Sequence, residues 1–379
     1  MKERSTFLGA VNPMLITVVV ALAVYGSIVV NAAVTGMDAG PGMFKRHLFG
    51  LAIGLVPLIV AWIFDYRTLE GWTGPLVGLT CFLIISPRIP GLGATAKGAQ
   101  LWLEIAGIRL FQPSEPAKLV FIVALAAVIA SQKGRISEFR DVARILAMAA
   151  VPFVLVVAVG DLGTALVFAA ITIGMLLVGG LSGRWFIALG LAGIVLVGAV
   201  LGLNAIVDKA TGQDKLLKQY QMDRLMVFID PSVDPKGAGY NLEQSKIAIG
   251  SGELTGKGLK SGTQSRLNFL PERHTDFIFS VLGEELGFAG AVTLLALYLL
   301  LLFTSLEISA QSRDLFGALI CTGIIAMWTF QILENMGMTI GLMPITGIPL
   351  PFMSYGASFM VTNLMATGML LSVWARRRA

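Results

Sequence analysis

A dense polar cluster, QSRLNFLPERHTD, occupies residues 264–276 and runs directly into an apolar stretch that starts at Phe277. Its last residue, Asp276, follows His274 and Thr275. An aspartate at the start of a helix commonly caps free N–H groups and lies at the positive end of the helix dipole. A single carboxylate in a covered, partly desolvated cleft can instead act as a general base. The pattern alone fits both interpretations of Asp276.

Charged residues also stand inside or at the ends of other apolar stretches, where charge is costly and usually functional. Glu115 and Lys118 are three residues apart, hence on one helical face, where they can pair or hold a polar headgroup or a cation. Asp161, in VGDLGTAL, either caps the following helix or faces a cavity. Glu284 and Glu285 are adjacent and point in different directions, so at most one of them shares a site with the aspartate described above.

The segment 207–276 contains ten Lys and Arg residues. Arginine contacts phosphate by two-pronged hydrogen bonds and lysine as a point charge, whereas attraction to anionic lipid headgroups is the less specific alternative. The sequence has no Walker loop, no dinucleotide glycine fingerprint and no HExxH. Because His47 and His274 are the only histidines, a histidine-rich metal site is excluded. At the end of another apolar stretch, helix-end polarity is enough to explain Gln331, Glu334 and Asn335.

The composition indicates that these residues belong to a membrane protein. Hydrophobic residues make up 56% of the 379 residues and charged residues only 13%, about half the share usual in soluble proteins. The long hydrophobic runs exclude a water-soluble enzyme, a disordered chain and a disulfide scaffold, and Cys81 and Cys321 inside them are expected to be buried thiols. A bilayer-spanning helix needs about 20 mostly apolar residues, and lipid permits no open strand edge. The sequence therefore predicts an all-α polytopic membrane protein with ten transmembrane helices, at about 14–34, 48–64, 71–86, 117–131, 143–159, 163–180, 184–206, 277–305, 315–334 and 357–375.

Basic residues in the short connections set the predicted orientation. Twelve Lys and Arg residues lie on the side of the termini and five on the opposite side, and positive residues favour the cytoplasm. Both termini are therefore predicted to be cytoplasmic, within a single domain of residues 1–379. The segment 207–276 then forms a large extracytoplasmic loop between the seventh and eighth spans. The net charge of +5 gives no reason to expect a nucleic acid partner.

Two other outer loops, 87–116 and 336–356, are punctuated by Gly and Pro. All three outer loops are expected to be structured, because a long structureless loop is uncommon. The first is expected to hold a piece that lies at the membrane interface. Short interfacial or re-entrant helices are expected in 207–276, and irregular backbone that dips back into protein is expected in the last loop.

Four stretches of these loops together resemble one family. GAQLWLEIAGIRLFQPSEPAKL, GDLGTAL, YNLEQSKIAIGSGELTGKGLKSGTQSRLNFLPERHTDFIF and MPITGIPLPFMSYGAS are similar to motifs of the SEDS proteins of bacterial cell walls (shape, elongation, division and sporulation). The QSRLNFLPE stretch is more similar to the rod-shape members than to the division members. The similarity covers most of the chain, with the motifs in order. Two positions depart from the usual pattern: Ala357 stands where a second glycine is usual, and Leu101 where arginine is usual.

The resemblance implies a peptidoglycan glycosyltransferase that polymerises lipid II during cell elongation, with its active site facing outward from the bacterial cytoplasmic membrane. It implies that Asp276 is the essential catalytic residue, and we assign it as the general base of an inverting transfer. The departing diphosphate needs positive charge, from Lys or Arg or from a divalent cation such as Mg²⁺, whereas no organic cofactor is implied. No metal ligand is assigned. The residues assigned to substrate binding are Glu115, Lys118, Asp161, Lys246, Arg266, His274, Thr275 and Ser354.

Two alternative functions fit the same sequence. A lipid II flippase or transporter would use a cavity with Glu115, Lys118 and Asp161 equally well, and a non-catalytic scaffold would only recruit cell-wall enzymes. The resemblance also implies partners. These are lipid II and lipid-linked glycan, a class B penicillin-binding protein (a transpeptidase) and other membrane proteins of the elongation complex.

Overall fold

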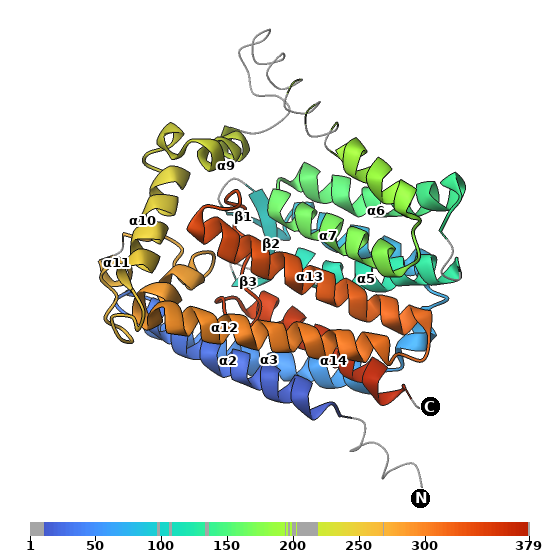
Figure 1. Ribbon diagram of the computed structural model, residues 1–379, viewed down its shortest axis with the longest axis horizontal. Coiled ribbons are helices and arrows are strands. Elements are labelled where there is room, and N and C mark those ends of the chain that lie inside the picture. Colours follow the sequence, from blue (N-terminus) through green and yellow to red (C-terminus); the bar gives the residue numbers. More distant parts are fainter. Residues whose placement is uncertain are drawn as a thin grey trace, which may run out of the picture.

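The computed structural model describes residues 11–377, apart from 97–98, 106–107, 133–135, 268 and most positions of 194–218. Long helices run side by side along one direction and form a bundle, and shorter helices gather at one end of it (Figure 1). The bundle helices are α2 (Pro13–Ala33), α3 (Gly40–Ile63), α4 (Thr73–Ile85), α5 (Ser114–Ser131), α6 (Phe139–Val159), α7 (Leu162–Val178), α12 (Ile278–Ala310), α13 (Leu315–Ile340) and α14 (Ala357–Ala375).

Seven of the described helices are long and apolar enough to cross a membrane, namely α2, α3, α5, α6, α12, α13 and α14. Two apolar helices are shorter, namely 73–88, formed by α4 with the 3₁₀ turn η2 (Ser86–Arg88), and α7. They correspond to the predicted spans 71–86 and 163–180. The seventh predicted span, 184–206, is helical over its described residues up to 193, and much of its remainder lies outside the described residues. The chain is therefore a mostly helical, multi-pass membrane protein.

The outward faces of these helices carry large apolar side chains. On α3, Phe49, Val56 and Val60 are 64%, 63% and 59% exposed. Apolar side chains on the outside would be unfavourable in water, but they match the hydrocarbon interior of a bilayer. The buried core lies between the helices, where α5, α13 and α14 bury most of their residues.

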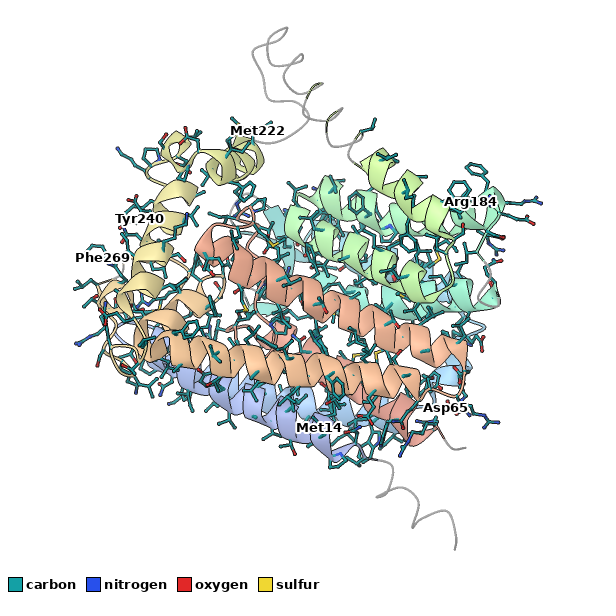
Figure 2. The ribbon with its side chains drawn as sticks, viewed as in Figure 1. Met14, Asp65, Arg184, Met222, Tyr240 and Phe269 are labelled. Atoms are coloured by element: carbon teal, nitrogen blue, oxygen red, sulfur yellow. The ribbon has the colours of Figure 1, made fainter. Side chains whose placement is uncertain are left out.

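The two ends of the bundle differ. The first helix, α2, begins and the last helix, α14, ends at the same end of the bundle (Figure 1). Met14, Asp65 and Arg184 lie at that end, whereas Met222, Tyr240 and Phe269 lie at the opposite one (Figure 2). The opposite end therefore carries the segment that the sequence predicted to be the large outer loop.

The first outer loop corrects the prediction of an all-α protein. It forms a three-stranded antiparallel sheet in the order β1 (Gly93–Ala96), β2 (Ala99–Ile105) and β3 (Ile108–Phe111). Leu103 of β2 pairs with Gly93 on one side and Phe111 on the other. The run Leu101 to Ile105 alternates in the period of a strand, so the expected interfacial piece is a small sheet.

The described part of 207–276 contains the short helices that the sequence predicted there. These are α9 (Gln219–Ile229), the 3₁₀ turn η3 (Pro231–Val233), α10 (Ala238–Ser251) and α11 (Thr263–Arg266). α10 packs against α12 and α13, and Ser245 in α10 hydrogen-bonds Ser280 at 2.6 Å and donates to the carbonyl of Thr339 at 2.7 Å. The large segment is therefore packed onto the bundle through buried polar contacts.

The helix α12 breaks at Gly287, which has φ of 64° and ψ of −162°. Residues of the segment after α10 replace the helical hydrogen bonds that this break removes. The N–H groups of 288 and 289 donate to the carbonyls of 253 and 254, at 2.9 and 3.0 Å. The carbonyls of 284 and 285 accept from the N–H groups of 257 and 258, at 3.0 and 2.9 Å. The break is tolerated because neighbouring protein satisfies the freed backbone groups.

Glu284, one turn before the break, fixes the same segment through its side chain. Its buried carboxylate accepts hydrogen bonds from Lys257 Nζ (2.9 Å), Thr263 Oγ1 (3.1 Å), Gln264 N (2.9 Å), Ser265 N (3.2 Å) and Ser265 Oγ (3.0 Å). The sequence left open whether Glu284 shares a site with Asp276. Its contacts give it another role, which is to hold the 257–265 connection.

We therefore expect Glu284→Gln to destabilise the protein. The substitution replaces an acceptor-only carboxylate by an amide whose NH₂ group faces N–H donors, and it removes the partner of Lys257. We expect the free energy of unfolding to fall by at least about 2 kcal/mol, seen as a lower melting temperature in detergent and faster proteolysis within 257–266. Glu307→Gln, near the other end of α12, is the matched control. Equal melting temperatures for the two variants would contradict the assigned role.

Candidate active site

Asp276 lies in a tight turn immediately before α12. The carbonyl of Glu272, a residue with φ of 52°, accepts hydrogen bonds from the N–H groups of Thr275 (3.1 Å), Asp276 (3.1 Å) and Phe277 (3.3 Å). The N-cap residue of α12 is Phe277, whose side chain makes no capping hydrogen bond. Asp276 is therefore not the N-cap residue of α12, as one interpretation of the sequence had expected.

The other side of this turn is held from α13 and from the last outer loop. The carbonyl of His274 accepts a hydrogen bond from the N–H of Tyr355 (2.9 Å). The carbonyl of Thr275 accepts one from the hydroxyl of Ser354 (2.7 Å), and the carbonyl of Asp276 accepts one from the side-chain amide of Asn335 (2.8 Å). Asn335 and Ser354 are fully buried. The backbone that carries the Asp276 carboxylate is thus fixed on both sides by groups far apart in the sequence.

The Asp276 carboxylate lies against Gly347 of the last outer loop. Gly347 has φ of +76°, and a Cβ atom at this position would lie 3.1 Å from Asp276 Oδ2 and 3.8 Å from Arg224 Nη1. Arg224, from α9, donates through Nη1 to the carbonyl of Thr346 at 3.1 Å. The buried carboxylate of Glu334, from α13, has Asp276, Arg224 and Thr346 as its polar neighbours. Four separate elements therefore bring two carboxylates and one guanidinium together.

Glu115 and Lys118 form a buried ion pair on α5. Lys118 Nζ lies 2.9 Å from Glu115 Oε1, and the two side chains are only 2% and 5% exposed. The ammonium also lies 5.7 Å from the centre of the Phe359 ring. Of the two interpretations that the sequence left open, the pair with each other is present. Glu115 Oε2 makes no hydrogen bond within the described residues, so this oxygen can still accept one.

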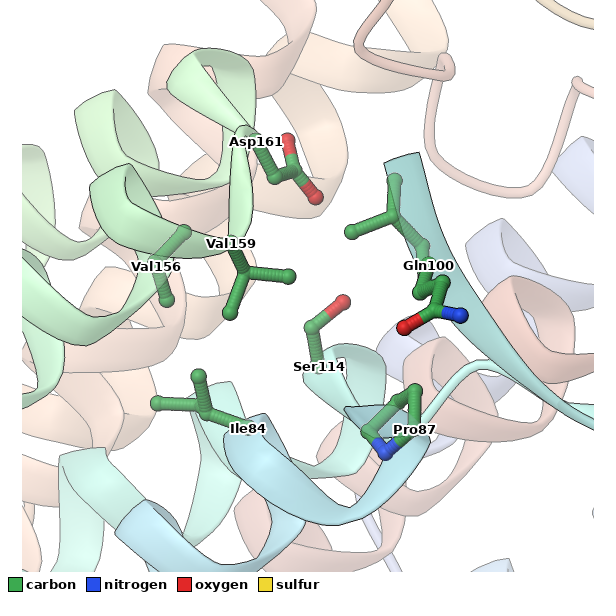
Figure 3. A pocket seen from close by; sticks show the side chains of 8 residues that line it. Ile84, Pro87, Gln100, Ser114, Val156, Val159 and Asp161 are labelled. Atoms are coloured by element: carbon green, nitrogen blue, oxygen red, sulfur yellow. The ribbon is translucent and has the colours of Figure 1, made fainter. Parts of the chain in front are cut away.

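Asp161 both caps a helix and borders a cavity. It accepts hydrogen bonds from the N–H of Thr164 at 3.0 Å and its hydroxyl at 2.8 Å, at the start of α7. The cavity is shown in Figure 3, where Asp161 and Ser114 face it from opposite sides and Gln100 of β2 lies beside it. The complete lining is Ile84, Pro87, Gln100, Leu101, Ser114, Val156, Val159 and Asp161. The motifs around Leu101, Ser114 and Asp161 therefore meet in space.

The last outer loop connects these motifs with Asp276. A Cβ atom on Gly163, near the start of α7, would lie 3.1 Å from the Thr346 carbonyl and 3.1 Å from Ile348, so this helix end packs on the loop beside Gly347. At the other end of the loop, the hydroxyl of Ser358 accepts a hydrogen bond from the N–H of Gln112 at 3.0 Å. This last motif is thus the common neighbour of the other three.

The remaining predicted residues occupy different environments. Lys246 and Arg266 are exposed, and Lys246 extends over Gly341 at the end of α13. The His274 ring packs on Tyr355 with 5.4 Å between ring centres, and the Thr275 hydroxyl donates back to the Glu272 carbonyl at 3.2 Å. Ser354 is buried in the contact with Thr275 described above. The assignment of these residues to substrate binding stays a prediction.

Sequence reasoning missed two members of the cluster around Asp276. Arg224 was one cation among ten in its segment, and nothing local distinguished it. Glu334 was attributed to polarity at a helix end, yet α13 continues to Ile340 and the Glu334 side chain is only 1% exposed. The available signal was the spacing of Gln331, Glu334 and Asn335, which places all three polar residues on one face of the helix.

We expect Ser354→Ala to destabilise the site. The Ser354 hydroxyl donates to the Thr275 carbonyl and accepts from the N–H of Leu350 at 2.8 Å, and the variant leaves both buried groups without a partner. The expected loss is about 1–3 kcal/mol of the free energy of unfolding, measured as a lower melting temperature. Ser251→Ala is the control, because within the described residues its hydroxyl bonds only the Ala248 carbonyl of its own helix, at 2.8 Å. A loss no larger than that of the control would contradict the role of Ser354.

Solved structures share this architecture. One described as structural coordination of polymerization and crosslinking by a peptidoglycan synthase complex matches with a TM-score of 0.78 and 29% sequence identity, over 97% of this chain and 98% of that chain. The crystal structure of the rod shape determining protein RodA from Thermus thermophilus matches with a TM-score of 0.70 and 27% identity, over 97% and 98% of the two chains. The fold is therefore that of RodA.

Sequence comparisons agree with the structural ones. The peptidoglycan glycosyltransferase MrdB of Escherichia coli (strain K12) is 39% identical over 378 residues, which cover 99% of this chain and 97% of MrdB. The stage V sporulation protein E of Bacillus subtilis (strain 168) is 35% identical over 331 residues, covering 87% of this chain and 86% of that protein. A sequence model of the FtsW/RodA/SpoVE family, described as cell cycle protein, matches residues 11–379. The chain therefore belongs to the FtsW/RodA/SpoVE family, the SEDS family that its motifs resemble.

Proposed function

We propose that this protein is a peptidoglycan glycosyltransferase that polymerises lipid II into glycan strands during cell elongation. The observation that carries the proposal is the Asp276 turn, whose three successive carbonyls are held by Tyr355, Ser354 and Asn335. A reactive group needs a fixed position to act on a bound substrate. The relative MrdB is named a peptidoglycan glycosyltransferase, which supports the same activity.

In the proposed reaction Asp276 is the general base. The acceptor is the sugar 4-hydroxyl of lipid II, and a sugar hydroxyl is a poor nucleophile. As its oxygen attacks the anomeric carbon of the lipid-linked glycan, the O–H proton passes to the Asp276 carboxylate. The bond from that carbon to the diphosphate breaks in the same displacement. The α-linked donor thus gives a β-linked product by inversion, without a covalent enzyme intermediate.

Arg224 is suited to stabilise the departing diphosphate. Its Nη1 atom and the Asp276 carboxylate lie against the same side of Gly347, so a base and a cation face one position. A guanidinium binds phosphate oxygens through two parallel hydrogen bonds. The buried pair of Lys118 with Glu115, and the exposed Lys246 and Arg266, are proposed to contact the polar headgroups of the two lipid-linked substrates.

The divalent cation predicted from the chemistry remains a proposal. In the described part of the chain, no three His, Cys, Asp or Glu side chains come together as a metal site. The described residues therefore do not fit a cage made by protein ligands alone. Mg²⁺ is commonly held by one or two carboxylates together with substrate phosphates, and a cation that arrives with the diphosphate would meet Asp276.

The proposed topology has ten transmembrane helices in a single domain of residues 1–379, with both termini in the cytoplasm. The site then faces outward from the bacterial cytoplasmic membrane. The position of α9, α10 and α11 at the end of the bundle opposite the ends of α2 and α14 supports this orientation (Figure 1). The excess of basic residues in the short connections on the side of the termini supports it as well.

The proposed partners are lipid II, lipid-linked glycan, a class B penicillin-binding protein and other membrane proteins of the elongation complex. The similar solved structure is described as a synthase complex that coordinates polymerization and crosslinking, which supports a crosslinking partner for this chain. A lipid II flippase and a non-catalytic scaffold are the competing functions. Neither of them requires a fixed base beside a cation.

Asp276→Asn tests the proposal. The amide keeps the shape of the side chain but cannot accept a proton, so we expect the rate of glycan formation to fall at least about a hundredfold. The assay supplies labelled lipid II to the full chain purified with its crosslinking partner. Asp230→Asn is the control, because the carboxylate of this exposed aspartate in the same segment bonds only Ser232 in the described residues, at 2.7 and 3.0 Å.

The competing functions predict other outcomes. Lipid movement in vesicles without polymer, unchanged in Asp276→Asn, would identify a flippase. Binding of the partner with neither activity would identify a scaffold. Full polymerisation by Asp276→Asn would overturn the assignment of the base.

Gly347→Ala provides a second test that leaves Asp276 itself unchanged. The added Cβ would lie 3.1 Å from Asp276 Oδ2, tighter than usual contact, so the carboxylate must shift. We expect at least a tenfold lower rate, about the effect of displacing a catalytic group by a fraction of an ångström. Gly91→Ala is the control, because Gly91 shares the positive φ (+85°) but a Cβ there meets nothing within 4 Å. Equal rates for both variants would contradict the placement of the carboxylate.

A further inference from the structure

A groove that the proposed reaction does not use lies at the end of the bundle where α2 begins and α14 ends. Arg184 marks its position there (Figure 2). The groove has a volume of about 530 Å³, a size typical of ligand-binding sites. Its lining consists of Ser137, Glu138, Phe139, Arg184, Trp185 and Ala188. None of these residues belongs to the site around Asp276, so the groove needs an explanation of its own.

The two walls of the groove are tied together by the backbone. One wall is the start of α6, and the other is the start of the helical residues 183–193. Just before them, Ile136 and Leu181 form an isolated parallel bridge. The N–H of Ile136 donates to the carbonyl of Gly180 at 3.4 Å, and its carbonyl accepts from the N–H of Ser182 at 3.2 Å. The two helix starts therefore have a fixed separation.

Two aromatic rings and one guanidinium pack together in the lining. The rings of Phe139 and Trp185 have 5.9 Å between their centres, and the Arg184 guanidinium lies 5.9 Å from the centre of the Trp185 ring. The Ser137 carbonyl accepts hydrogen bonds from Arg184 Nη2 at 2.6 Å and from Trp185 Nε1 at 3.0 Å. Within the described residues this is the only hydrogen bond of the guanidinium. Its other N–H groups are therefore held in place and can bind an anion.

The groove also contains a negative charge. Glu138 is the N-cap residue of α6, but its side chain makes no capping hydrogen bond. Within the described residues its exposed carboxylate forms no ion pair, so Glu138 and Arg184 line one groove without pairing with each other. A purely anionic ligand would be repelled by Glu138, and a purely cationic ligand by Arg184. A ligand that carries both charges would be complementary to the groove.

The apolar residues beside the groove place it at the membrane surface. Phe139 is 71% exposed, and Ile187 and Leu191, about one and two helical turns beyond Arg184, are 68% and 59% exposed. Exposed apolar side chains on a membrane helix match the hydrocarbon interior. Tryptophan is enriched where this interior meets the headgroups. The groove thus lies where the lipid-facing surface ends, at the level of the lipid headgroups.

We propose that this groove binds the headgroup of phosphatidylethanolamine from the leaflet on the side of the chain termini. Arg184 binds the phosphate through its remaining N–H groups, and the Glu138 carboxylate accepts hydrogen bonds from the ammonium group. The rings of Phe139 and Trp185 pack on the glycerol and on the first methylene groups of the acyl chains. The site is separate from Asp276, so the inference does not depend on the proposed function.

The charges of the groove select this headgroup over the other common phospholipids. In phosphatidylethanolamine the phosphate and the ammonium are two carbon atoms apart, so one headgroup presents both charges to the same groove. Phosphatidylglycerol has the phosphate but no cation for Glu138. Phosphatidylcholine has a methylated ammonium without N–H donors, so it cannot donate hydrogen bonds to the carboxylate.

Native mass spectrometry of the full chain in detergent tests the inference. The three lipids, with identical acyl chains, are added in turn. We expect one phosphatidylethanolamine per chain to bind with at least about fivefold higher affinity than either other lipid. Arg184→Gln is expected to weaken binding of all three lipids, because it removes the contact with the phosphate. Glu138→Gln is expected to remove only the preference for phosphatidylethanolamine.

Glu138→Lys distinguishes charge selection from a general disturbance of the groove. The variant gives the groove two cations, so we expect the preference to reverse in favour of phosphatidylglycerol. Arg140→Gln and Glu70→Gln are the controls, because both residues are exposed and neither lines the groove, and their lipid binding should equal that of the wild type. Equal binding of the three lipids by the wild type, or a preference that Glu138→Lys leaves unchanged, would overturn the inference.

Discussion

The contact on which the site depends is the set of hydrogen bonds between the last outer loop, α13 and the turn 274–276. Tyr355, Ser354 and Asn335 satisfy three successive carbonyls of this turn, and the Glu272 carbonyl satisfies the N–H groups that follow. The N-cap residue of α12 is Phe277, so the backbone holds this turn without the aspartate serving as the N-cap residue. Backbone donors at a cap would hold a carboxylate in its ionised form and make it a weaker base.

The same constraint governs the rest of the outer end of the bundle. Irregular backbone at membrane depth is stable only where protein satisfies its N–H and C=O groups. The break of α12 at Gly287 is satisfied by residues 253–258, and Glu284 holds the connection that follows. The large segment and the bundle therefore stabilise each other. This mutual support is how a site built from four distant motifs keeps one geometry.

The sequence predicted the helices well, because a bilayer forces long apolar runs that composition alone reveals. It predicted less where contacts are set by tertiary structure. A strand at 101–105 was not predicted, because the apolar runs before and after this loop are long enough to be membrane-spanning helices. Arg224 lies near Asp276 and donates to the carbonyl of Thr346, which is 122 residues away in the sequence. No local pattern encodes such a pairing. The motifs located Asp276, but not what holds it.

The charges at the site explain why stability and activity need not be optimised together here. Two carboxylates and one guanidinium meet there, and the carboxyl group on α13, that of Glu334, is buried and makes no hydrogen bond within the described residues. Replacing such a group by an apolar residue is often neutral or stabilising, and proteins commonly retain destabilising groups where function needs them. An apolar replacement of Glu334 is therefore expected to cost no stability.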